Sequence, residues 1–350
     1  MAIAAPARHP VRGWAYWNQF WLQTMAVPTV TTSDTEPKTY PSVSVIVPIY
    51  NGEADLPELV ERLLGQQYPA DRVEYLLVDN GSRDRTPDLI QIAAYQNSRL
   101  RALSYSTIQS SYAARNAGIA AATGEILAFT DADCQPEPDW LAALVQPFTD
   151  SSVGLVAGAI NALPSQNWLE RYADRQGTLS QLNTLNHPFL PYGQTANLAV
   201  RAKILGTVGC FRPHLTTGGD ADLCWRIQQE TDWRLVYAAD AVVYHRHRDT
   251  LNGLRSQWHR YGCSNRYLHE LHGVELMRSL TARETCYRLL RWGLKELPQA
   301  TIKLLTKRGT PLELMITPLD LWCARARSQG QAEAQLPAKA RTIAHLGNQI

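Results

Sequence analysis

Long hydrophobic runs, paired cysteines and a strong net charge are all missing from this sequence of 350 residues. No apolar run approaches the roughly 18 residues that a bilayer-spanning helix requires. The first residues also lack the continuous apolar segment of a signal peptide. We therefore expect a cytoplasmic protein, and peripheral contact with the inner face of the cell membrane stays open.

The cysteine pattern argues against two kinds of structural cross-link. The six cysteines are scattered along the chain and include no Cys-x-x-Cys pair. Such a pattern indicates reduced thiols and favours neither a disulfide framework nor a zinc site.

Charge and composition indicate the class of protein and the partners that it lacks reason to bind. The formal net charge is only +2, which gives no reason to expect a nucleic acid as partner. Hydrophobic residues make up 45% of the chain and charged residues 19%, as is typical of globular proteins. The length suffices for one large domain or two ordinary ones.

Residues 1–41 differ in composition from the rest and are predicted to form an aromatic appendage and linker. Trp and Tyr favour membrane–water interfaces, so an interfacial anchor and packing against the main domain both remain open. The aromatic residues crowded into this segment are Trp14, Tyr16, Trp17, Phe20 and Trp21.

The other end of the chain is helical and basic in pattern. Residues 251–330 are predicted to form a basic amphipathic helical extension, and residues 331–350 a tail. Basic amphipathic helices suit an anionic membrane surface, but a solvated helical subdomain is an equal alternative.

Between residues 42 and 250, short apolar runs alternate with helical segments. Strands are expected at 43–49, 73–78, 101–106, 125–130, 153–160, 197–200 and 233–244. Helices are expected at 54–67, from 86 onward, and at 111–122, 140–148, 168–184 and 219–229, with Thr86 as a cap. This alternation predicts an α/β fold with a doubly wound, mostly parallel sheet, a Rossmann-like arrangement.

Carboxylates follow two of the expected strands. Asp79 ends one strand, and Asp131 and Asp133 follow another, two residues apart. Residues i and i+2 of an extended segment project to the same side, and parallel strands end at one edge of the sheet. The acids can therefore converge on a hard cation that carries phosphate oxygens, although ordinary loop acids after a strand remain the alternative.

Several short motifs occur in a fixed order along the same region. They are Pro48-Ile49-Tyr50-Asn51, Asp79, Ala114-Arg115-Asn116-Ala117-Gly118, Asp131-Ala132-Asp133, Asp139-Trp140-Leu141 and Gly219-Asp220. In this combination, residues 42–265 closely resemble the family 2 glycosyltransferases of the GT-A fold.

The resemblance implies a site for a nucleotide-diphosphate sugar, with a UDP-sugar favoured. Tyr50 would lie against the nucleobase, with Pro48 shaping the turn beneath it, and Asp79 would hydrogen-bond the uracil or the ribose. Arg115 would approach the phosphates, and Asn116 would support its loop. The remaining implied donor contacts are those of Asn51, Asp131 and Gly193.

The resemblance also implies a metal and a base. Mn²⁺ or Mg²⁺ would bridge the two phosphates, held by Asp133 with Asp131 and His245. Asp220 matches the acid that serves as general base, which predicts a single displacement with inversion at the anomeric carbon. Independently of the resemblance, a departing diphosphate needs positive charge, and an attacking hydroxyl needs a carboxylate.

On the acceptor side, the resemblance points to a saccharide or glycolipid in cell-surface polysaccharide or glycolipid synthesis. Gln257-Trp258-His259-Arg260-Tyr261 resembles the family's Gln-x-x-Arg-Trp element, with Tyr in place of the last Trp. For Asp222, capping or salt-linking of its helix is the alternative to a role in binding. The acceptor-side candidates are Gly219, Asp222, Gln257 and Arg260.

Two departures from the family pattern keep other functions open. Gly219 stands where many relatives have Glu, and Asn80 stands where many have a second Asp. A non-catalytic sugar-nucleotide-binding scaffold therefore remains an alternative. A nucleotidyltransferase-like enzyme is the other alternative, although residues 50–53 lack the Gly-rich basic loop that it would need after its first strand.

Overall fold

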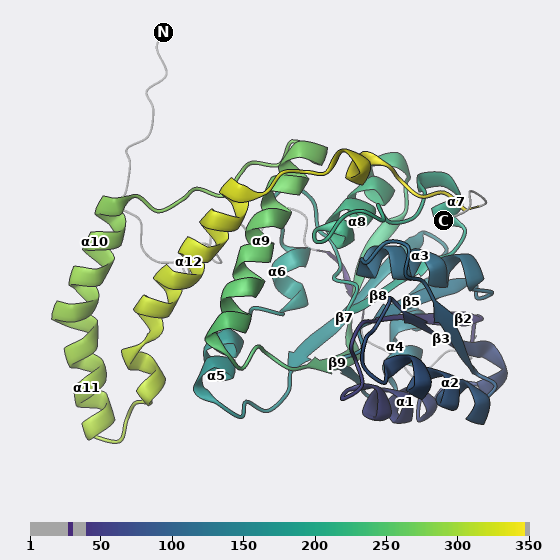
Figure 1. Cartoon of the computed structure of the whole chain (residues 1–350), viewed down its shortest axis with the longest axis horizontal. Coiled ribbons are helices and arrows are strands. Elements are labelled where there is room, and N and C mark those ends of the chain that lie inside the picture. Colours follow the sequence, from purple (N-terminus) through teal and green to yellow (C-terminus); the bar gives the residue numbers. More distant parts are fainter. Residues whose placement is uncertain (1–26, 31–39, 347–350) are drawn as a thin grey trace, which may run out of the picture.

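The computed structural model describes residues 27–30 and 40–346, and the expected aromatic appendage lies almost wholly outside these residues. The described chain is built on a nine-stranded sheet with the order β1-β9-β7-β8-β5-β2-β3-β4 and with β6 paired to β9 (Figure 1). The strands are β1 Thr29–Val30, β2 Val43–Ile49, β3 Val73–Asp79, β4 Leu100–Ser104, β5 Ile126–Thr130, β6 Cys134–Pro136, β7 Val153–Ala162, β8 Asn197–Arg201 and β9 Arg234–His245.

The sheet is mostly parallel, as the sequence predicts, with an antiparallel strand near its middle. β5, β2, β3 and β4 pair in parallel, and so do β7 and β9. β8 lies antiparallel between β5 and β7, and the short β6 lies antiparallel to β9. The pairing of β6 brings Cys134 opposite His245 and thereby joins two distant parts of the chain.

Helices cover both faces of the sheet because the central strands are apolar on both sides. Along β2, Val43, Val45 and Val47 pack into one layer and Ile46 into the other, as the alternation of a strand requires. The first layer contains α1 Leu56–Leu64, α2 Thr86–Gln96 and α4 Trp140–Val145. The opposite layer contains α3 Ser111–Ala121, α7 Ile204–Val208 and α8 Gly219–Glu230.

A set of long helices extends from one end of the sheet domain (Figure 1). α9 Leu251–His272 packs along α12 Ile316–Glu333, and their backbones approach closely at Gly262 and Gly330. Outside this pair runs one continuous helical stretch made of α10 Ala282–Arg291, a π-helical turn Trp292–Glu296 and α11 Leu297–Leu305. In the described part of the chain, no helix combines the length and the apolar character needed to cross a membrane.

Some local expectations differ from the structure. The helix expected over 168–184 is divided into α5 Trp168–Arg175 and α6 Gln181–Leu185. Thr86 is not a cap but the first residue of α2, and its Oγ1 accepts a hydrogen bond from Gly52 N (2.8 Å). Its hydroxyl thus ties the α2 start to the turn after β2.

The segment expected as a tail contacts the sheet domain as far as Ala344 and His345. After α12 the chain returns to the core, where Ala340 is fully buried. Cys210 N donates a hydrogen bond to Ala344 O (2.7 Å). A short apolar segment without periodicity resembles a tail in sequence, because its partners lie more than a hundred residues away.

Candidate active site

A cavity of about 430 Å³ opens at the carboxyl ends of β2 and β5. Its lining includes the loop after β2, the start of α3, the β5–β6 turn, the end of β9 and one side of α9. The predicted site residues that line it are Pro48, Tyr50, Asn51, Arg115, Asp131, Asp133, Asp220, His245, Gln257 and Arg260.

Arg115 and Asp131 form a charged pair on one wall. Ser110 Oγ accepts the hydrogen bond of Tyr112 N and so begins α3, which carries Arg115 one turn later. Arg115 Nη2 donates to Asp131 Oδ1 at 2.5 Å, while the buried Nε of Arg115 has no hydrogen-bond partner among the described residues. Because Arg115 lines the cavity, its positive charge is suited to an anionic group of a ligand.

Asp133 and His245 form a second pair. His245 Nε2 lies 3.2 Å from Asp133 Oδ2, and the ring Nδ1 lies 2.7 Å from Arg246 O. The carbonyl acceptor favours a proton on Nδ1, so the hydrogen bond to Asp133 requires a second proton on Nε2, whereas a ring without that proton would present its Nε2 lone pair to a cation. Burial opposes both charges, but their mutual hydrogen bond prevails, so the pKa of Asp133 is lowered and the pKa of His245 is raised.

These two side chains and Cys134 bring three ligand atoms within 4.8 Å of one another. A carboxylate oxygen and an oriented imidazole nitrogen fit a divalent cation. Cys134 fits less well, because burial raises the pKa of its thiol well above the ordinary value and thiolates favour softer metals.

Asp220 lies on the first turn of α8, which begins sharply because Gly218 adopts a left-handed conformation (φ 80°). Thr195 Oγ1 donates to Asp220 Oδ1 at 2.9 Å. Burial raises the pKa of Asp220, and the negative charge of Asp131 adds to this, against the lowering effects of Arg115 and Thr195. A carboxylate of raised pKa facing a cavity is typical of a general base.

The turn after β2 is held in place by the loop after β3. Asn51 has a left-handed backbone (φ 51°), and its Oδ1 accepts a hydrogen bond from Arg83 N (2.9 Å). Asp79 lies outside the cavity lining, and its carboxylate accepts from Gly81 N (3.2 Å) and Ser82 N (3.1 Å). The half-exposed Tyr50 ring therefore sits on a turn that Asp79 supports through its loop.

Four further predicted residues also lie outside the lining. Asn116 is buried and exchanges two hydrogen bonds with the backbone of Phe211, at 2.9 and 3.0 Å. Gly193 packs against Leu198, and Gly219 packs against the ring of Tyr112. Asp222 is the fourth.

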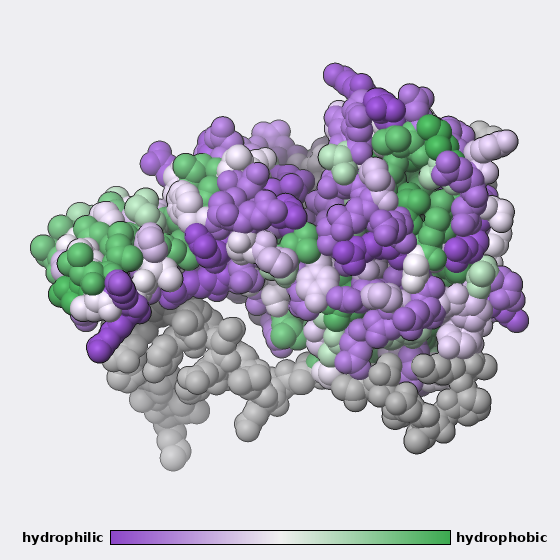
Figure 2. All heavy atoms as spheres, turned by 90° about the horizontal axis from the view of Figure 1, so that it is seen from below, coloured by the Kyte–Doolittle hydropathy of each residue, from purple (hydrophilic) through white to green (hydrophobic). Residues whose placement is uncertain are grey.

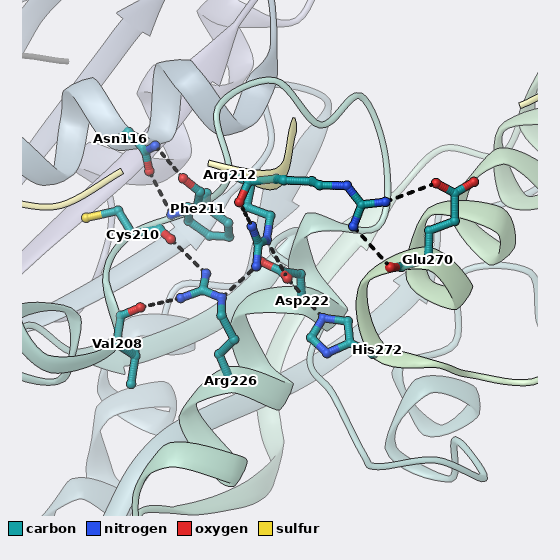
Figure 3. Close-up of polar contacts among 10 residues, drawn as sticks. Asn116, Val208, Cys210, Phe211, Arg212, Asp222, Arg226, Glu270 and His272 are labelled. Carbon is teal, nitrogen blue, oxygen red and sulfur yellow. Dashed lines mark hydrogen bonds and ion pairs between the residues drawn. The ribbon is translucent and has the colours of Figure 1, made fainter. Parts of the chain in front are cut away.

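The Asp222 carboxylate is fully buried between two arginines and a histidine (Figure 3). Arg212 Nε (2.9 Å) and His272 Nε2 (2.9 Å) contact one oxygen, and Arg226 Nε (3.1 Å) contacts the other. Arg226 also donates to the carbonyls of Val208 and Cys210. Asp222 thus joins α8 to the preceding loop and to the end of α9.

The cavity also contains polar residues that the sequence did not single out. Asp55, Gln194, Thr195 and Arg248 line it. Arg248 belongs to the His245-Arg-His-Arg run after β9, a pattern that could have signalled a charged wall. Thr195 and Asp55 carry no such signal, because only the tertiary structure brings them beside Asp220 and Asp133.

Comparison with known proteins gives consistent matches. A family model described as glycosyl transferase family 2 matches residues 44–213. Glycosyltransferase AglE of Haloferax volcanii is 33% identical over 208 residues, which cover 59% of this chain and 67% of the relative.

Pre-mycofactocin glycosyltransferase of Mycobacterium tuberculosis is 31% identical over 227 residues, or 63% of this chain. The matched region spans 46% of that relative, less than half of its length.

Among solved structures, mannosyltransferase PcManGT from Pyrobaculum calidifontis, in complex with GDP-Man and Mn²⁺, superposes with a TM-score of 0.60 and 20% identity. The superposition covers 91% of this chain and 94% of that one, and at this identity it concerns the fold. The chain therefore belongs to the family 2 glycosyltransferases and has their GT-A fold.

Proposed function

We propose that this glycosyltransferase moves one sugar from a nucleotide-diphosphate sugar, with a UDP-sugar favoured, to a hydroxyl acceptor with inversion. The carrying observation is that one cavity contains the Asp133–His245 pair, the Arg115–Asp131 pair and Asp220. The acceptor class that we propose is a saccharide or glycolipid of cell-surface polysaccharide or glycolipid synthesis.

Asp133 and His245 are the proposed ligands of Mn²⁺ or Mg²⁺, with Asp131 beside them. The 3.2 Å separation of Asp133 Oδ2 and His245 Nε2 supports this assignment, as does the contact of Nδ1 with a backbone carbonyl. A cation bound there would neutralise negative charge on the departing diphosphate.

Arg115 is the proposed phosphate contact. Its Nη2 is already paired with Asp131, and the residue lines the cavity, where its positive charge would attract a phosphate. The pair holds the guanidinium in one orientation before the donor arrives, which reduces the reorganisation needed on binding.

For the nucleoside, the proposed contacts are Tyr50, Pro48 and Asn51, on the turn that lines the cavity. Asp79 remains a predicted contact of the uracil or ribose, although its present partners are two backbone amides.

Asp220 is the proposed general base. Its carboxylate lines the cavity, and the bond from Thr195 Oγ1 orients one oxygen, so the other is available to accept the proton of the acceptor hydroxyl. The oxygen that loses this proton attacks the anomeric carbon while the bond to the diphosphate breaks. One displacement on the face opposite the leaving group inverts the configuration.

The test measures release of nucleoside diphosphate from a panel of sugar nucleotides, with and without Mn²⁺, in the wild type and in Asp133→Ala and Asp220→Asn. We expect Asp133→Ala to lose the metal-dependent rate. Asp220→Asn should lose at least about 100-fold in kcat and retain donor binding.

The matched control is Asp71→Asn, at an exposed site outside the cavity, which should leave turnover unchanged. Wild-type turnover in both site variants would refute the mechanism. Donor binding without any turnover in the wild type would favour the non-catalytic scaffold.

A further inference from the structure

The outermost helical stretch of the molecule exposes a row of large apolar side chains. From Ala282 to Leu305, α10, the π-helical turn and α11 run without a break and span about 36 Å. Along one side, large apolar residues are 57–80% exposed, at spacings of three or four within two groups that are separated by the interval from Leu294 to Ile302. This apolar stripe consists of Tyr287, Leu290, Leu294, Ile302 and Leu305.

The opposite side of the same stretch holds it to the protein. Trp292 Nε1 donates to Leu314 O (2.9 Å), Thr317 Oγ1 donates to Glu296 (2.5 Å), and Ala300 is buried. The apolar stripe is therefore not turned toward the core. Figure 2 shows hydrophobic surface gathered on this protruding end, with hydrophilic side chains beside it.

Charge is concentrated on the same stretch. Between Ala282 and Arg308 the chain carries seven basic and two acidic side chains, whereas the whole chain has a net charge of only +2. Both acids are paired, Glu296 with Arg291 (2.5 Å) and Glu284 with Arg278 (2.6 Å), and Lys303 is paired with Glu313 (3.1 Å). The basic side chains are Arg283, Arg288, Arg291, Lys295, Lys303, Lys307 and Arg308.

We propose that the apolar stripe lies in the interfacial layer of an anionic lipid bilayer, with basic side chains of the same stretch on the lipid headgroups. Three observations carry this assignment: the apolar residues are on a convex helix and not in a groove, they are distributed along its length, and basic side chains on the same stretch outnumber acidic ones by seven to two. A helix that lies in a membrane surface combines these features.

The docked helix would also fix the position of the active site. α10 and α11 pack on the segment that contains α12, and α12 contacts α9 through Gly262 and Gly330. α9 in turn contributes Gln257, Arg260 and Tyr261 to the cavity. Docking would therefore hold the cavity at a set height above the bilayer, which suits a lipid-linked acceptor. This last step rests on the proposed function, and the docking itself does not.

The experiment is flotation of the full-length protein with vesicles of phosphatidylcholine alone and with 30% phosphatidylglycerol. The stripe variant is Leu294→Asp with Leu305→Asp. Its matched control is Ile92→Asp with Tyr95→Asp, which adds the same charge at exposed apolar positions of α2, at the opposite end of the molecule (Figure 1).

We expect the wild type and the control to float with anionic vesicles, and the stripe variant to bind at least about tenfold more weakly. Arg283→Gln with Lys295→Gln should weaken binding to anionic vesicles only. Raising the salt concentration should have the same effect in the wild type.

Equal loss of binding in stripe variant and control, or binding by a folded stripe variant at the wild-type level, would overturn the proposal. So would a change of oligomeric state in the stripe variant without any change in vesicle binding, because that result assigns the stripe to a second copy of the chain. Circular dichroism of each variant establishes that it is folded. Vesicle binding is read without donor or acceptor, so its outcome is separate from that of the turnover assay.

Discussion

Asp220 and Asp222 are two residues apart on the first turn of α8, yet their carboxylates have different surroundings. Asp220 faces the cavity and accepts a hydrogen bond from the Thr195 hydroxyl, and burial leaves its pKa raised. Asp222 is surrounded by two guanidinium groups and an imidazole, which outweigh its burial and lower its pKa to about 2. The same residue type is therefore poised to accept a proton at one position and kept ionised at the other.

The pH dependence of turnover should report the state of Asp220. Its folded pKa is raised, and a base must be ionised, so activity should fall as the pH drops through a value above the ordinary Asp value of about 3.9. Thr195→Val removes a hydrogen bond that favours the ionised form and should move this acid limb to higher pH. The acid limb is measured as kcat against pH at saturating Mn²⁺. If Thr195→Val and the wild type had the same acid limb, the limb would belong to a group other than Asp220.

Neutralising the buried acid should affect stability first. Asp222→Asn leaves Arg212, Arg226 and His272 around an uncharged amide, and removing one partner of a buried ionic group costs about 3–5 kcal/mol. We expect a loss of about 3 kcal/mol in the free energy of unfolding, measured by urea denaturation at pH 7. Asp71→Asn, which is exposed, should change it by less than about 0.5 kcal/mol. If Asp222→Asn lost no more stability than Asp71→Asn, the result would contradict this account of the cluster.

Motif order in the sequence was enough to place most of the predicted site residues in one cavity. It was not enough for Asp79, Asn116, Gly193, Gly219 and Asp222, which lie outside the lining. Asn116, for example, directly follows Arg115, which does line the cavity. Which of two neighbouring polar residues points inward depends on partners from distant elements, such as Phe211 for Asn116. These partners cannot be identified from the residues that are adjacent in sequence.

At the scale of elements, the crossing of α9 and α12 depends on two glycines. A Cβ atom on Gly262 would lie 2.0 Å from Arg327 O, and one on Gly330 would lie 2.0 Å from His259 O. The two helices therefore touch backbone to backbone, and neither can accept a side chain there without moving apart.

Gly262→Ala should accordingly destabilise the protein by about 1–3 kcal/mol, because the added methyl group overlaps a backbone carbonyl. Gly206→Ala, in α7, is the matched control, since a Cβ there meets nothing within 4 Å and alanine favours a helix by about 1 kcal/mol. The measurement is the thermal midpoint of both variants. We expect the thermal midpoint to fall in Gly262→Ala and to rise in Gly206→Ala. An unchanged midpoint in Gly262→Ala would mean that α9 and α12 can move apart at no cost in stability.

The strands that the sequence locates best are those buried on both faces. β2 begins and ends as expected, and β3 differs by one residue, because an apolar run bounded by turns is a strong local signal. The antiparallel direction of β8 and the short β6 were not predictable in this way. Strand direction depends on which neighbour a strand pairs with, and a three-residue strand has too few positions to show a period.

At the scale of the whole molecule, the chain closes on itself. Residues 334–346 leave the helical extension and return to the sheet domain, where the fully buried Ala340 joins the core and Ala344 O bonds to Cys210 N. The carbonyl of Arg341 also accepts a hydrogen bond from Arg212, next to the Asp222 cluster.

Deleting residues 334–350 should therefore lower the free energy of unfolding by several kcal/mol, since it uncovers part of the core and removes a partner of Arg212. A shorter deletion, of residues 347–350, removes none of the contacts described and serves as the control. Urea denaturation compares both with the full chain. Equal stability of the longer deletion and the control would show that the returning segment is dispensable.

The return of the last residues to the core has a consequence for biosynthesis. Ala344 follows its partner Cys210 by more than a hundred residues and is therefore synthesised well after it. Domains begin to fold from their N-terminal parts during synthesis. Here the sheet can assemble before residues 334–346 are made, so a nascent chain carries an uncovered core edge until this segment has been synthesised and can reach Cys210.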